Sequence, residues 1–343
     1  MNDERADGPS FLGGLLHSLL WAIVWFAVLG GAAAGTGLWL RGQWDKPGPL
    51  TAAKAVVIPR GGTTAAAEAL KAAGVIENAT AFEALSWLTF FDGSIRAAEF
   101  AFPPKAAIAD VLVILRTAKP VEHKITIAEG LTAKQIAALA AAAEAAAGPA
   151  EVPLEGALLP QTYAFERGMT RESIFARARA AMDKEVAGIW SGRAQNLPLT
   201  SPRDLLIVAS IVERETARDD ERSHVAAVYL NRLRLGMKLQ ADPTVAYAVS
   251  GGTGVLDHRL NRGDLERDDP YNTYKRNGLP PGPICSPGVA SLRATARPMV
   301  SDDLYFVADG SGGHAFAKTL EAHNRNVARW RGPQTVEPVG TGR

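Results

Sequence analysis

A glutamate at the end of an apolar segment is the residue best placed to do chemistry. Glu213 follows the run Leu205–Val212 and, at helical spacing, stacks over apolar or small side chains three, four and seven positions earlier. The next turn offers Thr216 and Ala217 rather than a cation. Burial without a charged partner favours the protonated carboxyl, so we expect Glu213 to have a raised pKa and to act as a general acid. Considered alone, the segment favours a simpler interpretation, in which Glu213 only marks where a core helix reaches solvent.

The second glutamate, Glu215, is expected at the surface, because Arg218 follows three residues later and can hold it as an ion pair. The helix that carries both acids has a well-defined start. Ser201 is a good N-cap, Pro202 suits the first helical position, and Asp204 can complete a capping box. The sequence therefore predicts a helix from Pro202 to about Arg218.

A long irregular stretch is predicted from residue 240 to residue 288. It is polar, is interrupted by proline and glycine, and is too long to serve only as a connection. Structureless length of this kind inside a compact domain is typical of a binding surface. A second irregular loop, also marked by glycine and proline, is predicted at residues 154–165.

The composition excludes several classes of protein. The 343 residues are 47% hydrophobic, which is enough for two or three domains with their own cores. With 37 basic and 36 acidic residues, the net charge of +1 provides no field for nucleic acid, and no such partner is expected. Cys285 is the single cysteine, which excludes an intramolecular disulfide and a multi-cysteine metal site. His314 and His323 match no zinc motif, so neither a metal nor another cofactor is expected.

An apolar segment near the N-terminus predicts a membrane-spanning helix. Residues 19–40 carry no charge, and about 20 such residues cross a bilayer. Tryptophans lie toward both ends, as interfacial aromatic residues do, and Arg41 closes the run. A cleaved signal peptide is the alternative, but it requires a basic leading segment, and here three acids precede the run against one arginine. We therefore expect an uncleaved anchor.

The charges that flank this helix point to a cytoplasmic main domain. Arg41, Lys46, Lys54 and Arg60 follow the helix, whereas Arg5 alone precedes it. The positive-inside rule, taken literally, keeps the basic side in the cytoplasm. A cytoplasmic enzyme is therefore an alternative to the exported protein described below.

The remaining pattern predicts an α+β protein. Two segments, 55–73 and 124–132, each have the pattern of a strand, a turn and the start of a helix. Further helices are expected where apolar or alanine residues recur at helical spacing, at 82–91, 108–115, 137–147, 171–189 and 223–235. Strands are expected at 98–102 and 304–308, and the second of these is expected to return through a turn at 309–313 to a partner strand at 314–316.

Six sequence blocks carry a more specific signal. They are Ala209–Thr216, Val228–Leu233, Gly236–Thr244, Tyr271–Tyr274, Gly278–Gly282 and Tyr305–Gly310. Together, and in this order, they resemble the endolytic murein transglycosylases, the MltG or YceG-like family. The resemblance runs from the membrane helix to about Trp330 and is strongest after Gly156. It implies an α+β fold with an N-terminal transmembrane helix, a small LysM-like α+β region, and a catalytic domain of mixed helices and strands.

The resemblance also implies a place and a task. It implies a single-pass protein of the bacterial inner membrane, with a periplasmic catalytic domain that cuts nascent peptidoglycan strands within the chain. The implied partners are glycan strands, the inner membrane and peptidoglycan synthases. In that family the glutamate of the Ile-Val-Glu block is catalytic, which here is Glu213. The expected domains are a cytoplasmic tail (1–18), a transmembrane helix (19–40), a LysM-like region (41–122), a YceG-like catalytic domain (123–330) and a disordered tail (331–343).

One acid can suffice for the implied reaction, although hydrolytic glycosidases ordinarily use two carboxylates. In a lytic transglycosylase, the C6 hydroxyl of N-acetylmuramic acid attacks C1. This step cleaves the MurNAc-GlcNAc β-1,4 bond and leaves a 1,6-anhydroMurNAc end, which limits strand length. The same glutamate can protonate the leaving oxygen and then accept the proton of the C6 hydroxyl. Because the nucleophile is tethered, its effective molarity reaches about 10⁵ M or more.

The irregular stretch supplies candidate residues for binding such a substrate. Amide and hydroxyl groups suit N-acetyl and hydroxyl recognition, and a tyrosine can stack on a sugar face. The candidates are Gln240, Asp242, Thr244, Asn272, Thr273 and Tyr274. For each of them the alternative is a structural role in a turn or loop. Gln161 and Tyr163 are weaker candidates on the same grounds.

Two other functions fit the sequence. One is a non-catalytic, membrane-anchored glycan-binding scaffold, which Glu213 on its apolar helix argues against, because a binding module needs no desolvated acid. The other is a muramidase that uses water as the nucleophile, for which Asp242 is the candidate second carboxylate.

Overall fold

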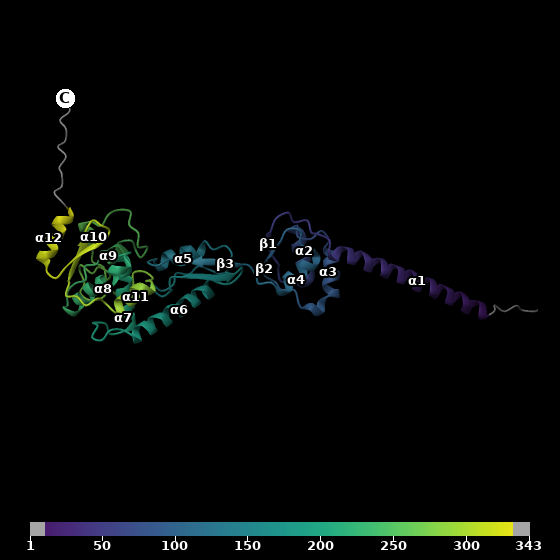
Figure 1. The fold of residues 1–343 in the computed structure, drawn as a ribbon, viewed down its shortest axis with the longest axis horizontal. Helices are drawn as coiled ribbons and strands as arrows, with labels where there is room; N and C mark the ends of the chain where they lie inside the picture. The colour runs from purple at the N-terminus through teal and green to yellow at the C-terminus, as the bar shows by residue number, and fades with distance from the viewer. Residues whose placement is uncertain (1–10, 332–343) are drawn as a thin grey trace, which may run out of the picture. The chain divides into compact units, whose positions relative to one another are not determined.

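The computed structural model describes residues 11–331 and divides into two compact units (Figure 1). One unit ends at Val121 and the second begins at Glu122. The predicted tails reach beyond the described residues at both ends, and the domain assignments stay predictions. Residues 11–18, which the sequence assigned to a tail, belong to the first helix.

The first unit begins with the long helix α1 (Phe11–Trp44), purple in Figure 1. Its segment His17–Trp44 has 28 residues and is long and apolar enough to cross a membrane. The side chains from His17 to Trp39 are exposed. A helix that is apolar on all sides needs a nonpolar environment, which agrees with the predicted membrane span.

The rest of the first unit is a small α+β body. The strands β1 (Lys54–Val57) and β2 (Glu99–Phe102) pair antiparallel. The helical elements are α2 (Gly62–Ala72), α3 (Ala79–Leu88), the short 3-10 helix η1 (Phe90–Asp92) and α4 (Ile108–Thr117). Phe82, Phe100 and Phe102 are fully buried among them. The predicted strand at 98–102 is confirmed, whereas the helix predicted at 82–91 begins earlier, at Ala79, because Asn78 caps it.

The second unit opens with a two-stranded antiparallel ribbon covered by helices. The elements are β3 (Glu122–Thr126), α5 (Ala133–Ala141), β4 (Thr162–Glu166) and α6 (Arg171–Ser191). The prediction of a loop at 154–165 is wrong at its C-terminal end, where the chain forms β4. Tyr163 and Phe165 alternate along this strand and both point into the core. The helix predicted at 137–147 stops at Ala141, because composition alone does not place a helix end.

Three helices form the main core of the second unit: α7 (Pro202–Glu215), α8 (Asp219–Arg234) and α11 (Val289–Ala296). Ser201, Pro202 and Asp204 start α7 as predicted, with the capping box formed. Two short helices, α9 (Asp242–Val249) and α10 (Arg262–Glu266), lie within the stretch predicted as irregular. The described part of the chain ends with β5 (Tyr305–Ala308), its antiparallel partner β6 (His314–Ala317) and α12 (Leu320–Arg331).

These elements bring the two glutamates into contact with distant parts of the chain. Helix α7 contacts α8, α9 and α11. Both glutamates lie in the last turn of α7, and only three residues separate this helix from α8. The end of α7 therefore meets side chains from α8 and the start of α11.

Candidate active site

Glu213 is held by two groups from elsewhere in the second unit. Its side chain is only 7% exposed. Its Oε2 accepts a 2.9 Å hydrogen bond from the backbone N–H of Gly288, the residue that precedes α11. Its Oε1 lies 3.9 Å from Nη2 of Arg222, which α8 supplies. The expectation that Glu213 has no cationic partner is therefore wrong. It considered only the turn that directly follows Glu213, whereas Arg222 comes from the next helix, α8.

Glu215 has a different environment. The hydroxyl of Tyr229, from α8, donates a hydrogen bond to its Oε1. The pKa of Glu215 is raised to about 7; burial is the largest cause and the charge of Asp242 adds to it, while the Tyr229 hydrogen bond and the Arg232 charge lower it. The predicted surface pair with Arg218 is wrong, because the Arg218 guanidinium instead binds Asp220, at 2.6 Å.

A cavity of about 160 Å³ opens at Glu215. Three of the predicted substrate-binding residues line it, namely Gln240, Asp242 and Tyr274, together with Tyr229, Arg232, Leu239 and Phe306. Tyr274 donates its hydroxyl hydrogen to Oδ1 of Asp242 at 2.5 Å. Arg232 donates to the carbonyl of Leu239 at 2.6 Å, which anchors the cavity wall. Glu215 also belongs to the lining of a second hollow, of about 220 Å³, together with Glu129 and Glu213.

The other three predicted binding residues are buried within the protein. Thr244 Oγ1 donates a hydrogen bond to the carbonyl of Ala241 at 2.7 Å and lies at hydrogen-bond distance, 2.9 Å, from Oγ1 of Thr273. The amide of Asn272 donates to the carbonyls of Leu265 and Arg267 at 3.0 and 2.7 Å. These contacts hold the chain that carries Gln240 and Tyr274. We therefore assign Thr244, Asn272 and Thr273 to positioning, and their direct contact with substrate stays a prediction.

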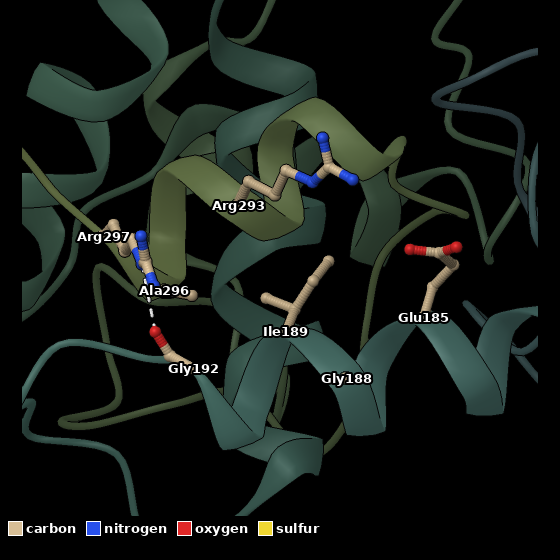
Figure 2. Close-up of a pocket in the computed structure, with 7 residues that line it drawn as sticks. All are labelled: Glu185, Gly188, Ile189, Gly192, Arg293, Ala296 and Arg297. Carbon is tan, nitrogen blue, oxygen red and sulfur yellow. Dashed lines mark hydrogen bonds between the residues drawn. The ribbon is translucent and has the colours of Figure 1, made fainter.

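A separate cavity, of about 360 Å³, lies between α6 and α11, away from the cavity and the hollow that Glu215 lines (Figure 2). Glu185, Arg293 and Arg297 line it, and Nε of Arg297 donates to the carbonyl of Gly192 at 3.0 Å. None of the predicted site residues lines this cavity. We therefore place the candidate active site at Glu215.

The arrangement at Glu215 suits proton transfer to and from a ligand. A carboxyl whose pKa lies near 7 is present in both protonation states around neutral pH, which is the condition for acting as an acid and then as a base. The cavity offers further hydrogen-bonding groups, from the side chains of Gln240, Asp242 and Tyr274. In contrast, one oxygen of Glu213 accepts the Gly288 hydrogen bond, and the Arg222 guanidinium lies 3.9 Å from the other.

Comparison with known proteins identifies the family. Residues 56–329, most of the chain, match the model of the YceG-like family. This chain belongs to the YceG-like family. Two curated proteins similar to it are both named endolytic murein transglycosylase. The first, from Bacillus subtilis, is 39% identical over 173 residues, which are 50% of this chain and 47% of that protein. The second, from Streptococcus pneumoniae, is 38% identical over 182 residues, 51% of this chain and 32% of that protein.

A solved structure agrees with the family assignment. The crystal structure of a YceG-like protein from Listeria monocytogenes is 31% identical to this chain, with a TM-score of 0.54. The match covers 80% of this chain and 98% of that one. The curated relatives are matched over less than half of their own length, so this YceG-like chain shares only part of those proteins.

Sequence reasoning missed several residues around the acids of this YceG-like protein. Tyr229 and Arg232 contact or face Glu215 from one side of α8, where they are three residues apart. Both lie within the block Val228–Leu233, so a role for them near the site could have been suspected. Nothing in the local sequence connects Gly288 with Glu213, because 75 residues separate them.

Proposed function

We propose that this protein is a membrane-anchored endolytic peptidoglycan lytic transglycosylase. The names of its curated relatives support this activity. The observation that carries the proposal is the carboxyl of Glu215, with a pKa near 7, in a cavity lined by the polar side chains of Gln240, Asp242 and Tyr274. A scaffold that only binds glycan has no need for a carboxyl in this state.

Within this proposal, Glu215 is a better general acid than Glu213. Glu213 is engaged by Gly288 and Arg222, contacts that suit a carboxylate joining α7 to the start of α11. Glu215 accepts a hydrogen bond from one neutral hydroxyl and lines the cavity that Gln240, Asp242 and Tyr274 also line. We therefore move the catalytic role predicted for Glu213 to Glu215 and give Glu213 a positioning role.

The reaction then follows from one carboxyl. Protonated Glu215 gives its proton to the oxygen of the MurNAc-GlcNAc β-1,4 bond, and the bond between that oxygen and C1 breaks. The C6 hydroxyl oxygen of the same MurNAc bonds to C1, and its proton passes to the Glu215 carboxylate. The product is a 1,6-anhydroMurNAc end, and the enzyme returns to its starting protonation state. Gln240, Asp242 and Tyr274 are in place to hydrogen-bond the sugar.

Mass spectrometry of the products tests this proposal. Uncrosslinked nascent glycan strands are incubated with the full chain, with Glu215→Gln and with Glu213→Gln, whose folding is checked by circular dichroism. We expect anhydro-muramyl ends that disappear with Glu215→Gln, a loss of about 10² to 10⁴-fold, and that persist with Glu213→Gln. Loss with Glu213→Gln alone would return the role to Glu213. Absence of cleavage by the wild-type chain would favour the glycan-binding scaffold.

A muramidase-type hydrolase is a second candidate, because Asp242 lines the same cavity as Glu215. A second carboxylate could activate water in that position. Reducing ends in place of anhydro ends would identify this mechanism.

The cellular setting is proposed on the same basis. We propose that α1 anchors the protein in the bacterial inner membrane, that the units after it lie in the periplasm, and that the region 41–122 is LysM-like. The segment His17–Trp44, which is long and apolar enough to span a membrane and is exposed from residue 17 to residue 39, supports the anchor. An alkaline phosphatase fusion after residue 60 tests the orientation, since the reporter is active only when exported. Contact with peptidoglycan synthases is a further proposal, which co-purification of the full chain from membranes would test.

A further inference from the structure

The first unit exposes a cluster of large apolar side chains at one corner. Trp87 and Leu88 end α3, and Phe90 and Phe91 follow in η1. Phe91 is 85% exposed and Trp87 is 73% exposed. We call these four residues the aromatic corner. Large aromatic side chains grouped on a surface mark a site that meets another apolar surface.

The aromatic corner belongs to the same compact unit as the apolar helix. Helix α1 contacts both α3 and α4, and Figure 1 shows α3 beside the end of α1. Leu40, the last residue of the uncharged run, is buried in the core of the unit, and Trp44 packs against that core. No flexible linker therefore separates the apolar helix from the folded unit.

This attachment determines how far the unit lies from a bilayer. The apolar segment of 28 residues is about 42 Å long at 1.5 Å per residue, and the hydrocarbon core is about 30 Å thick. The end of α1 therefore reaches the headgroup region, and Leu40 already contacts the folded unit there. Tryptophan is enriched at this depth, and tryptophan, phenylalanine and leucine are the apolar side chains of segments that lie in the interface.

We propose that the aromatic corner inserts into the headgroup region of the membrane that α1 spans, and so orients the first unit on the bilayer surface. The occupant is the lipid itself, because α1 and the aromatic corner belong to the same unit. Leu40, at the end of the uncharged run, already packs in the core of that unit, so no linker lets the unit move away from the bilayer. This inference rests on the proposed membrane anchor and is independent of the proposed enzymatic activity.

Fluorescent labels in the full chain test the inference. The chain is reconstituted into vesicles of phosphatidylethanolamine and phosphatidylglycerol, some containing lipids with a doxyl quencher on the acyl chain. A polarity-sensitive dye is attached to Phe91→Cys, to Val28→Cys within α1 and to Val57→Cys. Val57 is an exposed side chain of β1, which Figure 1 shows on the side of this unit away from α1. The wild-type chain reports any background labelling of Cys285, which is buried.

We expect the doxyl lipid to quench the dye at residues 28 and 91 and not at residue 57, with emission at residue 91 shifted to shorter wavelength. Quenching at residue 28 with none at residue 91 would overturn the inference and leave the anchor intact. Absence of quenching at residue 28 would overturn both. A dye at residue 91 that is shielded from doxyl lipid and also from aqueous iodide would be covered by protein, and that result too would overturn the inference.

Discussion

The hydroxyl of Tyr229 donates a hydrogen bond to Oε1 of Glu215, and so links the middle of α8 to the last residue of α7. The pKa of Glu215 is raised to about 7, mainly by burial and also by the charge of Asp242, and this hydrogen bond lowers it. The protonation state of Glu215 therefore depends on its burial, on the Tyr229 hydroxyl and on the Asp242 carboxylate. Removing either of these two side-chain groups must shift the pKa of Glu215 in a known direction.

The first prediction concerns the pH dependence of the wild-type protein. If protonated Glu215 starts the reaction, kcat/KM falls as pH rises through about 7, because the free enzyme loses the required proton. Initial rates of glycan cleavage between roughly pH 5 and pH 9 locate this descending limb of the pH profile of kcat/KM. A limb close to the ordinary glutamate value, 4.5, would mean that Glu215 is not the acid.

The second prediction is that Tyr229→Phe moves this limb to higher pH. The substitution keeps the ring and removes the one hydrogen bond that lowers the pKa of Glu215. The same rate measurements report the shift. Tyr271→Phe is the matched control, because Tyr271 is a half-buried tyrosine that does not act on Glu215, and its profile should coincide with that of the wild type.

The third prediction is that Asp242→Asn moves the limb to lower pH. Asparagine can still accept the Tyr274 hydrogen bond, but it lacks the charge that raises the pKa of Glu215. A transglycosylase keeps cleaving below the shifted limb, since its nucleophile belongs to the substrate. Loss of cleavage at every pH in a folded variant would indicate instead that Asp242 activates water in a hydrolase.

The fourth prediction separates the two glutamates by stability. The folded-state pKa of Glu215 is raised above 4.5, so its stabilising contribution is complete below about pH 4.5 and is lost as pH rises through about 7. The shift corresponds to a loss on the order of 3 kcal/mol. We therefore expect Glu215→Gln to be more stable than the wild type above pH 7 and equal to it in acid.

Glu213→Gln should behave in the opposite way at neutral pH. It gives up a charge-assisted hydrogen bond from Gly288 and the nearby Arg222, at a cost of about 1–3 kcal/mol. Thermal unfolding of the three proteins across the pH range measures both effects. Equal behaviour of the two glutamine variants would contradict the separate roles assigned to the two acids.

The fifth prediction tests the positioning role of Asn272. Its amide satisfies the carbonyls of Leu265 and Arg267, so Asn272→Ala should lower the free energy of unfolding by about 1–3 kcal/mol for each carbonyl left unpaired. Asn277→Ala is the control, since Asn277 is an exposed asparagine in the same loop. Chemical denaturation measures the difference, and an unchanged stability of Asn272→Ala would show that its hydrogen bonds are dispensable.

Features that depend on neighbouring residues could be predicted from the sequence. The start of α7 at Pro202, the apolar segment of α1 and the pairing of β5 with β6 are confirmed. A cap, a long apolar run and a hairpin involve contacts within a few residues, so their signals are local. The six sequence blocks also predicted the YceG-like family, which the family match confirms.

Tertiary contacts decided the environments of the two acids. The sequence placed Glu215 at the surface beside Arg218 and left Glu213 without a cation, and both expectations were wrong. Tyr229 reaches Glu215 from 14 residues away, and Gly288 reaches Glu213 from 75 residues away. A carboxyl's pKa depends on every group packed around it. The sequence thus determined that two acids end an apolar helix, and only the packing of α8 and α11 against α7 decided how their environments differ.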